Sequence, residues 1–105
     1  MNSQLDDAFG ALANPVRRGI VERLAQGPAT VAVATGGLGV SKPAISRHLR
    51  VLEDAGLVRR EVRGRTHRLS LADGTLADAL AWLARQEAMW QRKFDVIDAY
   101  LEERR

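Results

Sequence analysis

Residues 40–58, which read VSKPAISRHLRVLEDAGLV, carry the signals of a complete amphipathic helix. Ser41 is a favoured N-cap, and Gly56 supplies the backbone freedom with which helices commonly end. Pro43 falls in the first turn, where proline is tolerated. A stripe at spacings i, i+4 and i+7 would form the buried face: Ile45, Leu49 and Leu52. We therefore expect a helix over residues 41–55.

The opposite side of this helix would be polar and cationic. It carries Ser46, Arg47 and Arg50, and Lys42 lies at its flank near the N-terminus. Arginine binds guanine edges through two hydrogen bonds, and the short serine side chain permits close approach, so the helix suits a DNA major groove. His48 lies near the apolar stripe, which leaves two interpretations open: a packed histidine with one hydrogen bond, or a phosphate contact.

A β-hairpin is predicted directly after the helix, over residues 57–71. Residues 57–62 read as a strand, residues 63–64 as a turn and residues 65–71 as the return strand. The hairpin carries five arginines: Arg59, Arg60, Arg63, Arg65 and Arg68. Arginines on a protruding β-ribbon suit phosphate contacts or insertion into a narrow minor groove. His67 is interpreted as a solvated strand residue.

The preceding residues indicate three shorter helices. The first is expected over residues 3–13, and the second begins at Pro15, with Asn14 as its N-cap. The third, capped by Thr30, contains β-branched residues followed by two glycines, so we expect it to be short or frayed. After the turn that follows, Val40 is expected to enter the core.

Residues 75–104 predict a helix of about 30 residues with two apolar stripes. One stripe comprises Leu76, Leu80, Leu83, Trp90, Phe94, Ile97 and Leu101. The other comprises Trp82, Met89, Val96 and Tyr100. A body of about 70 residues cannot cover both, and soluble monomers avoid large apolar patches. We expect one stripe to pack on the body and the other on a second subunit, and the sequence leaves open which is which.

The terminal helices are therefore predicted to form a homodimer interface. Its candidate residues are Leu5, Phe9, Trp82, Met89, Trp90, Val96 and Tyr100. An aromatic-lined inducer pocket is an alternative role for Trp82 and Trp90. Residues 1–105 are then expected to form one domain, mainly α with a small β-hairpin. Its order is four helices, two strands and a long last helix, which is that of a winged helix-turn-helix.

Positive charge is concentrated in the centre of the sequence. The 105 residues carry a net charge of +3, but residues 41–71 alone hold eight basic and three acidic side chains, a net +5. Residues 1–40 are neutral and residues 72–105 carry −2. This distribution implies a partner of dense negative charge, of which the phosphate backbone is the usual one. A solvated basic face without a partner is the alternative.

The composition argues against several classes of function. The sequence has no cysteine, which excludes disulfides, thiolate nucleophiles and cysteine-ligated metals. Two histidines without a phosphate loop or a nucleophile motif leave no catalytic constellation, so we expect neither enzymatic activity nor a cofactor. No apolar run long enough to span a membrane and no signal peptide are visible, which predicts a cytoplasmic protein.

Two segments resemble the arsenical-resistance repressor (ArsR) family. Residues 12–21, LANPVRRGIV, resemble its opening signature, and residues 40–58 resemble its recognition helix and first wing strand. The turn at residues 63–65 and the strand that ends at Leu71 also fit, so the resemblance covers about residues 5–71. It implies a homodimeric repressor of transcription, released by an inducer or another signal that the residues do not identify.

The same resemblance implies which positions touch DNA. They are Lys42, Ser46, Arg47 and His48 in the recognition helix and Arg63 and Arg65 in the wing, to which we add Arg50 from its exposed position. Metal-sensing members carry a cysteine pair in the helix near residues 31–37, or Asp, His and Glu ligands on the last helix. This sequence has neither the cysteines nor a histidine in its last helix, so no metal site is expected.

We predict a sequence-specific regulator of double-stranded DNA that acts as a homodimeric repressor on a palindromic operator. The alternative is a winged-helix module that binds another protein and has no specific DNA binding. Both predict the same fold and dimer. The +5 segment with Ser46 and Arg47 facing outward favours DNA, because a protein-binding face would more often be apolar.

Overall fold

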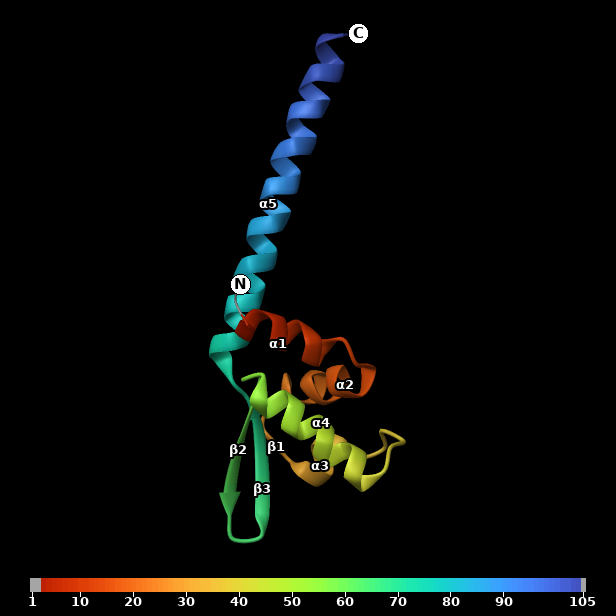
Figure 1. The fold of residues 1–105 in the computed structure, drawn as a ribbon, viewed down its shortest axis with the longest axis vertical. Helices are drawn as coiled ribbons and strands as arrows, with labels where there is room; N and C mark the ends of the chain where they lie inside the picture. The colour runs from red at the N-terminus through yellow and green to blue at the C-terminus, as the bar shows by residue number, and fades with distance from the viewer. Residues whose placement is uncertain (1–2, 105) are drawn as a thin grey trace.

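The computed structural model describes residues 3–104 as a small body from which one long helix projects (Figure 1). The elements are α1 (Ser3–Leu12), α2 (Pro15–Leu24), β1 (Ala29–Thr30), α3 (Val31–Thr35), α4 (Lys42–Asp54), β2 (Val58–Arg63), β3 (Thr66–Leu71) and α5 (Asp73–Glu103). The predicted order of four helices, a hairpin and a long last helix is confirmed. One strand, β1, is additional.

Helices α3 and α4 form the helix-turn-helix. Helix α4 starts as predicted because Ser41 Oγ accepts a backbone N–H of its first turn at 3.3 Å. Helix α3 is short, as expected, and is capped by Thr30. The turn between them passes through Gly39, whose φ of 73° favours glycine. The expectation for Val40 was wrong: its side chain is 38% exposed, and Leu38 packs against the core instead.

The hairpin β2–β3 has a third strand beside it. Strand β1 pairs antiparallel with β3, placing Ala29 opposite Leu69 and Thr30 opposite Arg68. Two residues are too few to show an alternating pattern, and Thr30 carries a helix N-cap signal at the same time, so no local pattern indicates this strand. The pairing fixes the base of the wing against the start of α3.

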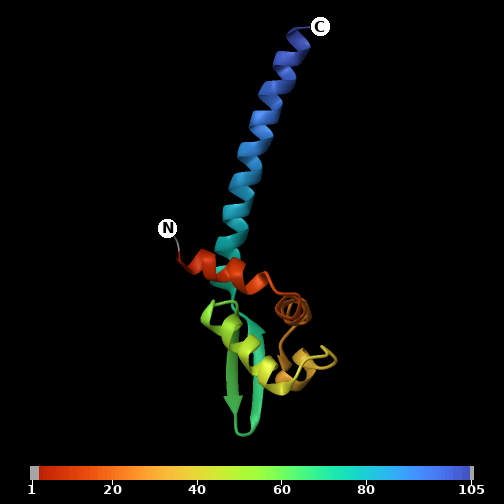
Figure 2. The ribbon, with the colours of Figure 1, turned by 45° about the vertical axis from the view of Figure 1, so that its right-hand side comes forward.

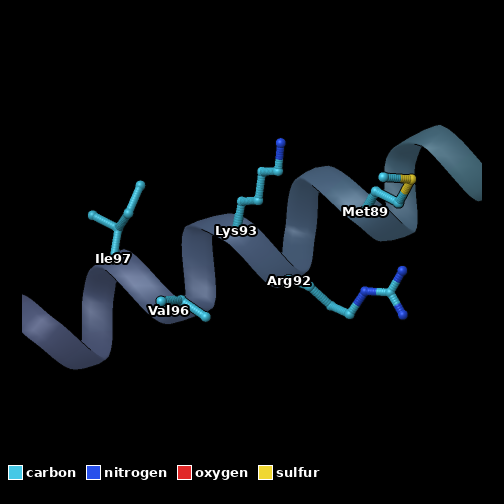
Figure 3. Close-up of a pocket in the computed structure, with 5 residues that line it drawn as sticks. All are labelled: Met89, Arg92, Lys93, Val96 and Ile97. Atoms are coloured by element: carbon cyan, nitrogen blue, oxygen red, sulfur yellow. The ribbon is translucent and has the colours of Figure 1, made fainter.

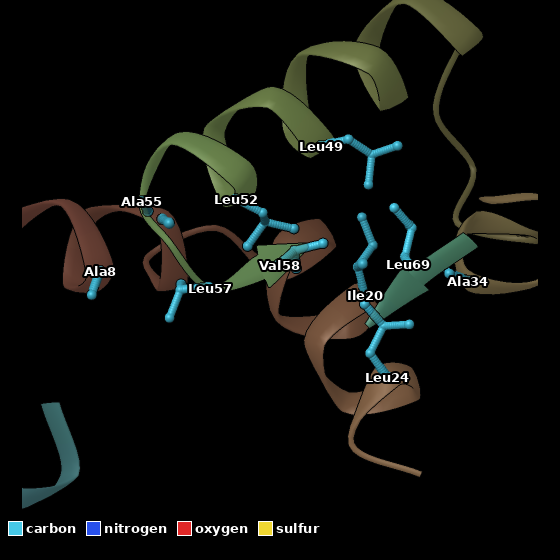
Figure 4. Packing of buried hydrophobic residues seen from close by; sticks show 11 residues of the cluster. Ala8, Ile20, Leu24, Ala34, Leu49, Leu52, Ala55, Leu57, Val58 and Leu69 are labelled. Atoms are coloured by element: carbon cyan, nitrogen blue, oxygen red, sulfur yellow. The ribbon is translucent and has the colours of Figure 1, made fainter. Parts of the chain in front are cut away.

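The core lies between α1, α2, α4 and the base of the sheet, where apolar side chains point toward one another (Figure 4). Its largest fully buried side chains are Ile20, Leu52, Leu57 and Leu69. Two of the three residues of the predicted α4 stripe, Leu49 and Leu52, are buried, and Ile45 packs against the cluster from its edge. The recognition-helix candidate is thus held by its whole apolar face.

The end of α4 meets the start of α5 at Gly56. This glycine has a φ of 74°, and a Cβ atom built there would lie 2.6 Å from Thr75 Oγ1. Thr75 is itself buried and accepts a hydrogen bond of 2.8 Å from Gln4 Nε2 of α1. Both the backbone conformation and the close approach therefore require glycine at this junction of three helices.

Helix α5 leaves the body after its first turns and extends the molecule to 69 Å (Figures 1 and 2). It packs on α1 through Thr75, Leu76 and Ala79. Our expectation that one apolar stripe would pack on the body was wrong. Beyond Leu76 the whole stripe is exposed, namely Leu80, Leu83, Trp90, Phe94, Ile97 and Leu101. A straight helix of this length outruns a body of this size.

Among residues 3–104, no helix combines the length and the apolar character needed to cross a membrane.

Candidate DNA-binding surface

The exposed face of α4 carries the predicted polar and cationic residues. Lys42, Ser46, Arg47 and Arg50 are all exposed. At 100° per residue, Arg47 lies opposite the buried stripe of the helix, which is the side farthest from the body. Ser46 and Arg50 lie on the flank toward the wing, where they line a groove together with Arg60. The face therefore presents donors suited to base edges and phosphates.

The wing tip carries the other two predicted residues, Arg63 and Arg65. Both are exposed, on either side of Gly64, whose φ of 61° closes the turn. Arg63 Nε donates to Glu61 Oε1 at 2.7 Å, but both side chains are largely exposed. Such a solvated ion pair contributes little and is readily exchanged for a phosphate.

Arg60 has a structural role within the wing. Its Nη2 and Nε donate to Glu53 Oε1 of α4 at 2.5 and 3.1 Å, and its Nη1 lies 3.1 Å from Nδ1 of His67 on β3. The interpretation of His67 as a solvated residue was therefore wrong. The network joins the end of α4 to both strands of the wing and so links the two DNA-binding candidates, helix and hairpin.

His48 forms a hydrogen bond with Arg17 of α2. Arg17 Nη1 lies 3.1 Å from His48 Nδ1, while Arg17 Nε and Nη2 donate to the carbonyls of Ala11 and Gly10 at 2.7 and 3.2 Å. Partial burial, and then the nearby guanidinium groups of Arg17 and Arg47, lower the pKa of the His48 imidazole. The hydrogen bond to Arg17 agrees with the interpretation of His48 as a packed histidine. A contact of His48 with a phosphate stays a prediction.

Arg23 supports the helix-turn-helix from behind. Its Nη1 donates to the carbonyl oxygens of Ala34 and Gly36 at 3.2 and 2.5 Å, at the end of α3. These carbonyls have no partner within so short a helix, so the guanidinium of Arg23 caps the C-terminus of α3. The contact spans eleven to thirteen residues of sequence, and no local pattern indicates it.

The predicted dimer residues lie on α1 and along α5. Leu5 and Phe9 are half-buried, and the Phe9 ring packs edge-on against Trp82 of the same subunit, with centroids 5.8 Å apart. Met89, Trp90, Val96 and Tyr100 are exposed, Trp90 by 62% and Val96 by 69%. These four residues lie on the part of α5 beyond the body.

An apolar hollow lies on this outer part of α5. It is lined by Met89, Arg92, Lys93, Val96 and Ile97 (Figure 3). A single helix supplies all five residues, so the hollow is the open surface of that helix and encloses no ligand site. Neither tryptophan of the suggested inducer pocket lines this hollow; Trp82 lines a separate hollow between α1 and α5, and the inducer pocket stays a prediction.

Within residues 3–104, no three His, Cys, Asp or Glu side chains come together in a group that could hold a metal ion.

A sequence model described as a helix-turn-helix domain matches residues 12–61, from the end of α1 to β2. The transcriptional repressor SdpR of Bacillus subtilis is 30% identical over 79 residues, which are 75% of this chain and 88% of that protein. A crystal structure of an ArsR family transcriptional regulator is 35% identical, with a TM-score of 0.78 over 84% of this chain and 97% of the other. The chain belongs to the ArsR family of transcriptional regulators.

Two mycobacterial relatives extend the comparison. The transcriptional regulator Rv2034 of Mycobacterium tuberculosis is 55% identical over 53 residues, which are half of this chain and half of that protein. The homodimeric winged helix-turn-helix DNA-binding domain Mb0332 of Mycobacterium bovis is 28% identical, with a TM-score of 0.64 over 83% of this chain and 82% of the other. Membership in this family makes the protein a DNA-binding regulator of transcription and not an enzyme.

Proposed function

We propose that this protein is a sequence-specific repressor that binds a palindromic site in double-stranded DNA as a homodimer. The observation that carries the proposal is the exposed face of α4, where Ser46, Arg47 and Arg50 project from a helix whose other face is buried in the core. The first turns of α4 and the tip of the wing both lie at the end of the molecule away from the outer part of α5, whereas the last turn of α4 meets the start of α5 (Figures 1 and 2). One duplex can therefore meet both.

Each element has a proposed part in the complex. The recognition helix, residues 41–55, enters the major groove, where Arg47 reads a base edge and Ser46 allows the helix to approach. Lys42, His48 and Arg50 contact phosphates or bases beside it. The wing, residues 57–71, places Arg63 and Arg65 on the backbone or in the minor groove. Occupation of the site would block the polymerase, which makes repression the expected outcome.

The homodimer is proposed to form through α1 and the C-terminal helix, residues 75–104. Its support is the row of exposed apolar side chains beyond the body, which in a monomer would form an apolar patch of the kind that marks an interface. A two-fold axis between subunits would place the two recognition helices about one helical turn, 34–36 Å, apart. At that spacing the two recognition helices can enter successive major grooves, one at each half of a palindromic operator.

The signal that releases the repressor is proposed to be other than metal binding at the two sites described for the family. The sequence has no cysteine, and its last helix has no histidine. Carboxylates alone would be an unusual zinc site.

The proposal is tested by fluorescence anisotropy of the purified protein. The probes are the DNA upstream of its own gene and an unrelated fragment of equal length, each at low and near-physiological salt. Tight binding to the upstream DNA alone is expected, with a salt slope that counts the phosphate contacts. Equal, weak binding to both fragments that vanishes with salt would contradict it and leave the protein-binding module as the better description.

A further inference from the structure

We propose that Arg17 is a positioning residue, which clamps the recognition helix to α1 through His48 and holds it only while the imidazole of His48 is neutral. The inference rests on the proposed contact of α4 with DNA. It predicts that acidification weakens DNA binding, although acid adds positive charge to the protein.

The clamp joins three helices through one side chain. Arg17 lies in the first turn of α2, where the Asn14 carboxamide oxygen accepts its backbone N–H at 3.1 Å. Its guanidinium donates to the carbonyls of Gly10 and Ala11 in the last turn of α1, where the Gly10 carbonyl also accepts the backbone N–H of Ala13 at 3.2 Å. The remaining nitrogen reaches His48 on α4 at 3.1 Å. Arg17 therefore fixes α4 relative to the helix that is proposed to dimerise.

The chemistry of the contact makes it sensitive to protonation. A guanidinium has only donors, so His48 Nδ1 must accept and the proton of the neutral ring must lie on Nε2. A second proton would place one N–H against another. It would also set an imidazolium beside Arg17 on α2 and Arg47 on α4, while α1 contributes only uncharged carbonyls to this contact.

The pH range of the effect follows from the same surroundings. Partial burial and the two guanidinium groups lower the pKa of His48 below the ordinary 6.5. The clamp is therefore closed at neutral pH and opens on the acid side of 6.5. A histidine that merely contacted a phosphate would behave in the opposite way, because its protonation adds an ion pair with DNA. The neutral ring of the clamp still carries an Nε2–H that can donate to DNA, so the sign of the pH dependence shows whether the clamp or a phosphate contact of the charged ring governs binding.

Three variants test the clamp. His48→Asn keeps an acceptor near the position of Nδ1 and cannot titrate. Arg17→Gln removes the bridging donors, and Arg18→Gln is its matched control, because Arg18 also donates to the end of α1, at the carbonyl of Leu12, but has no hydrogen bond to His48 among residues 3–104. Kd for the upstream DNA is measured by anisotropy from about pH 7.5 down to about pH 4.5, because the lowered pKa of His48 places its protonation below the ordinary histidine value. Thermal unfolding is followed to verify that each variant is folded.

The expected result is a difference between the native protein and His48→Asn. The native Kd should rise about tenfold on acidification relative to that variant, the size expected for the loss of a charge-assisted hydrogen bond. Arg17→Gln should weaken binding about tenfold at neutral pH and lose the extra pH dependence. Arg18→Gln should show only the smaller loss of one surface charge. A native affinity that rises on acidification relative to His48→Asn, or equal losses in the two arginine variants, would overturn the clamp.

A measurement on the protein without DNA tests the Arg17–His48 contact separately from the proposed function. Nitrogen-15 NMR of the imidazole should show His48 as the Nε2–H tautomer with a pKa below 6.5 that rises in Arg17→Gln but not in Arg18→Gln. An Nδ1–H tautomer would refute the clamp even if the protein binds its operator. Conversely, a correct tautomer in a protein that binds no upstream DNA would refute the proposed function and leave the clamp standing.

Discussion

The body of the molecule and the outer part of α5 are both rich in apolar side chains, but only the body covers them. Ile20, Leu52 and Leu69 in the body are fully buried, whereas Trp90, Phe94 and Leu101 on α5 are more than half exposed. The same residue types thus stabilise the fold of one subunit in one region and remain available to a second subunit in the other. The hydrophobic pattern of a helix therefore does not say which molecule will cover it.

The strongest effect should come from a substitution in the body. Leu52→Ala removes a side chain from the centre of the core and should lower the free energy of unfolding by about 3 kcal/mol, since the cavity cannot fully collapse. Leu101→Ala makes the same change on α5 and should lower the stability by less than about 0.5 kcal/mol when extrapolated to low protein concentration. Urea unfolding monitored by circular dichroism measures both. Equal losses would show that the two regions do not differ as described.

The next effect tests the outer part of α5. Trp90→Asp places a carboxylate in the centre of the proposed interface and should weaken the dimer by about 2 kcal/mol, as expected for an aromatic anchor. Ala88→Asp adds the same charge on the polar side of the helix and serves as the control. Sedimentation equilibrium gives the dissociation constants. A dimer that survives Trp90→Asp would mean that this face is covered by something other than a second copy.

A smaller effect compares the two DNA-binding elements of the body. Arg47→Ala should cost about 1–3 kcal/mol on the native operator and relax the preference for one base pair, because a base contact is lost. Arg63→Ala, in the wing, should weaken binding to every sequence by the same factor. It should also reduce the slope of log Kd against log salt concentration by about one. Anisotropy against a panel of single-base operator variants distinguishes the two. A uniform loss for Arg47→Ala would reassign that arginine to a phosphate.

The weakest effect concerns the joint between helix and wing. Glu53→Gln removes the charge from the pair with Arg60, in which both side chains are about a third exposed. Solvent screening limits the expected loss of stability to about 0.5–1 kcal/mol, and high salt should reduce it further. Urea unfolding at low and high salt measures the difference from the native protein. A loss of stability that is the same at low and high salt would show that Glu53 stabilises the protein by packing and not by its charge.

Local signals were sufficient to predict most of the elements. The caps at Asn14, Thr30 and Ser41, and the glycine turns after α4 and in the wing, act within a few residues and therefore appear directly in the sequence. The periodicity of α4 also predicted correctly which of its faces is exposed, because a buried stripe of three apolar residues leaves little freedom in the orientation of a short helix.

The side-chain networks and the position of α5 could not be predicted in this way. The contacts of Arg17, Arg23 and Arg60 with distant helices and strands depend on where the backbone places carbonyls and imidazoles that are remote in sequence. For α5, the two apolar stripes correctly indicated that the body could not cover both. Their periodicity does not indicate how far the helix projects, and that projection leaves even the main stripe exposed beyond Leu76.

At Gly56 the end of α4 lies against Thr75, so the direction in which α5 projects is set at this junction. The 31 residues of α5 span about 46 Å, so a rotation of about 5° at Thr75 would displace the far end by about 4 Å. Conversely, a partner that locates the far end to within an ångström would restrict the angle at the junction to little more than about one degree. The length of α5 therefore means that a small uncertainty in the position of its far end corresponds to a very small uncertainty in the angle at its base.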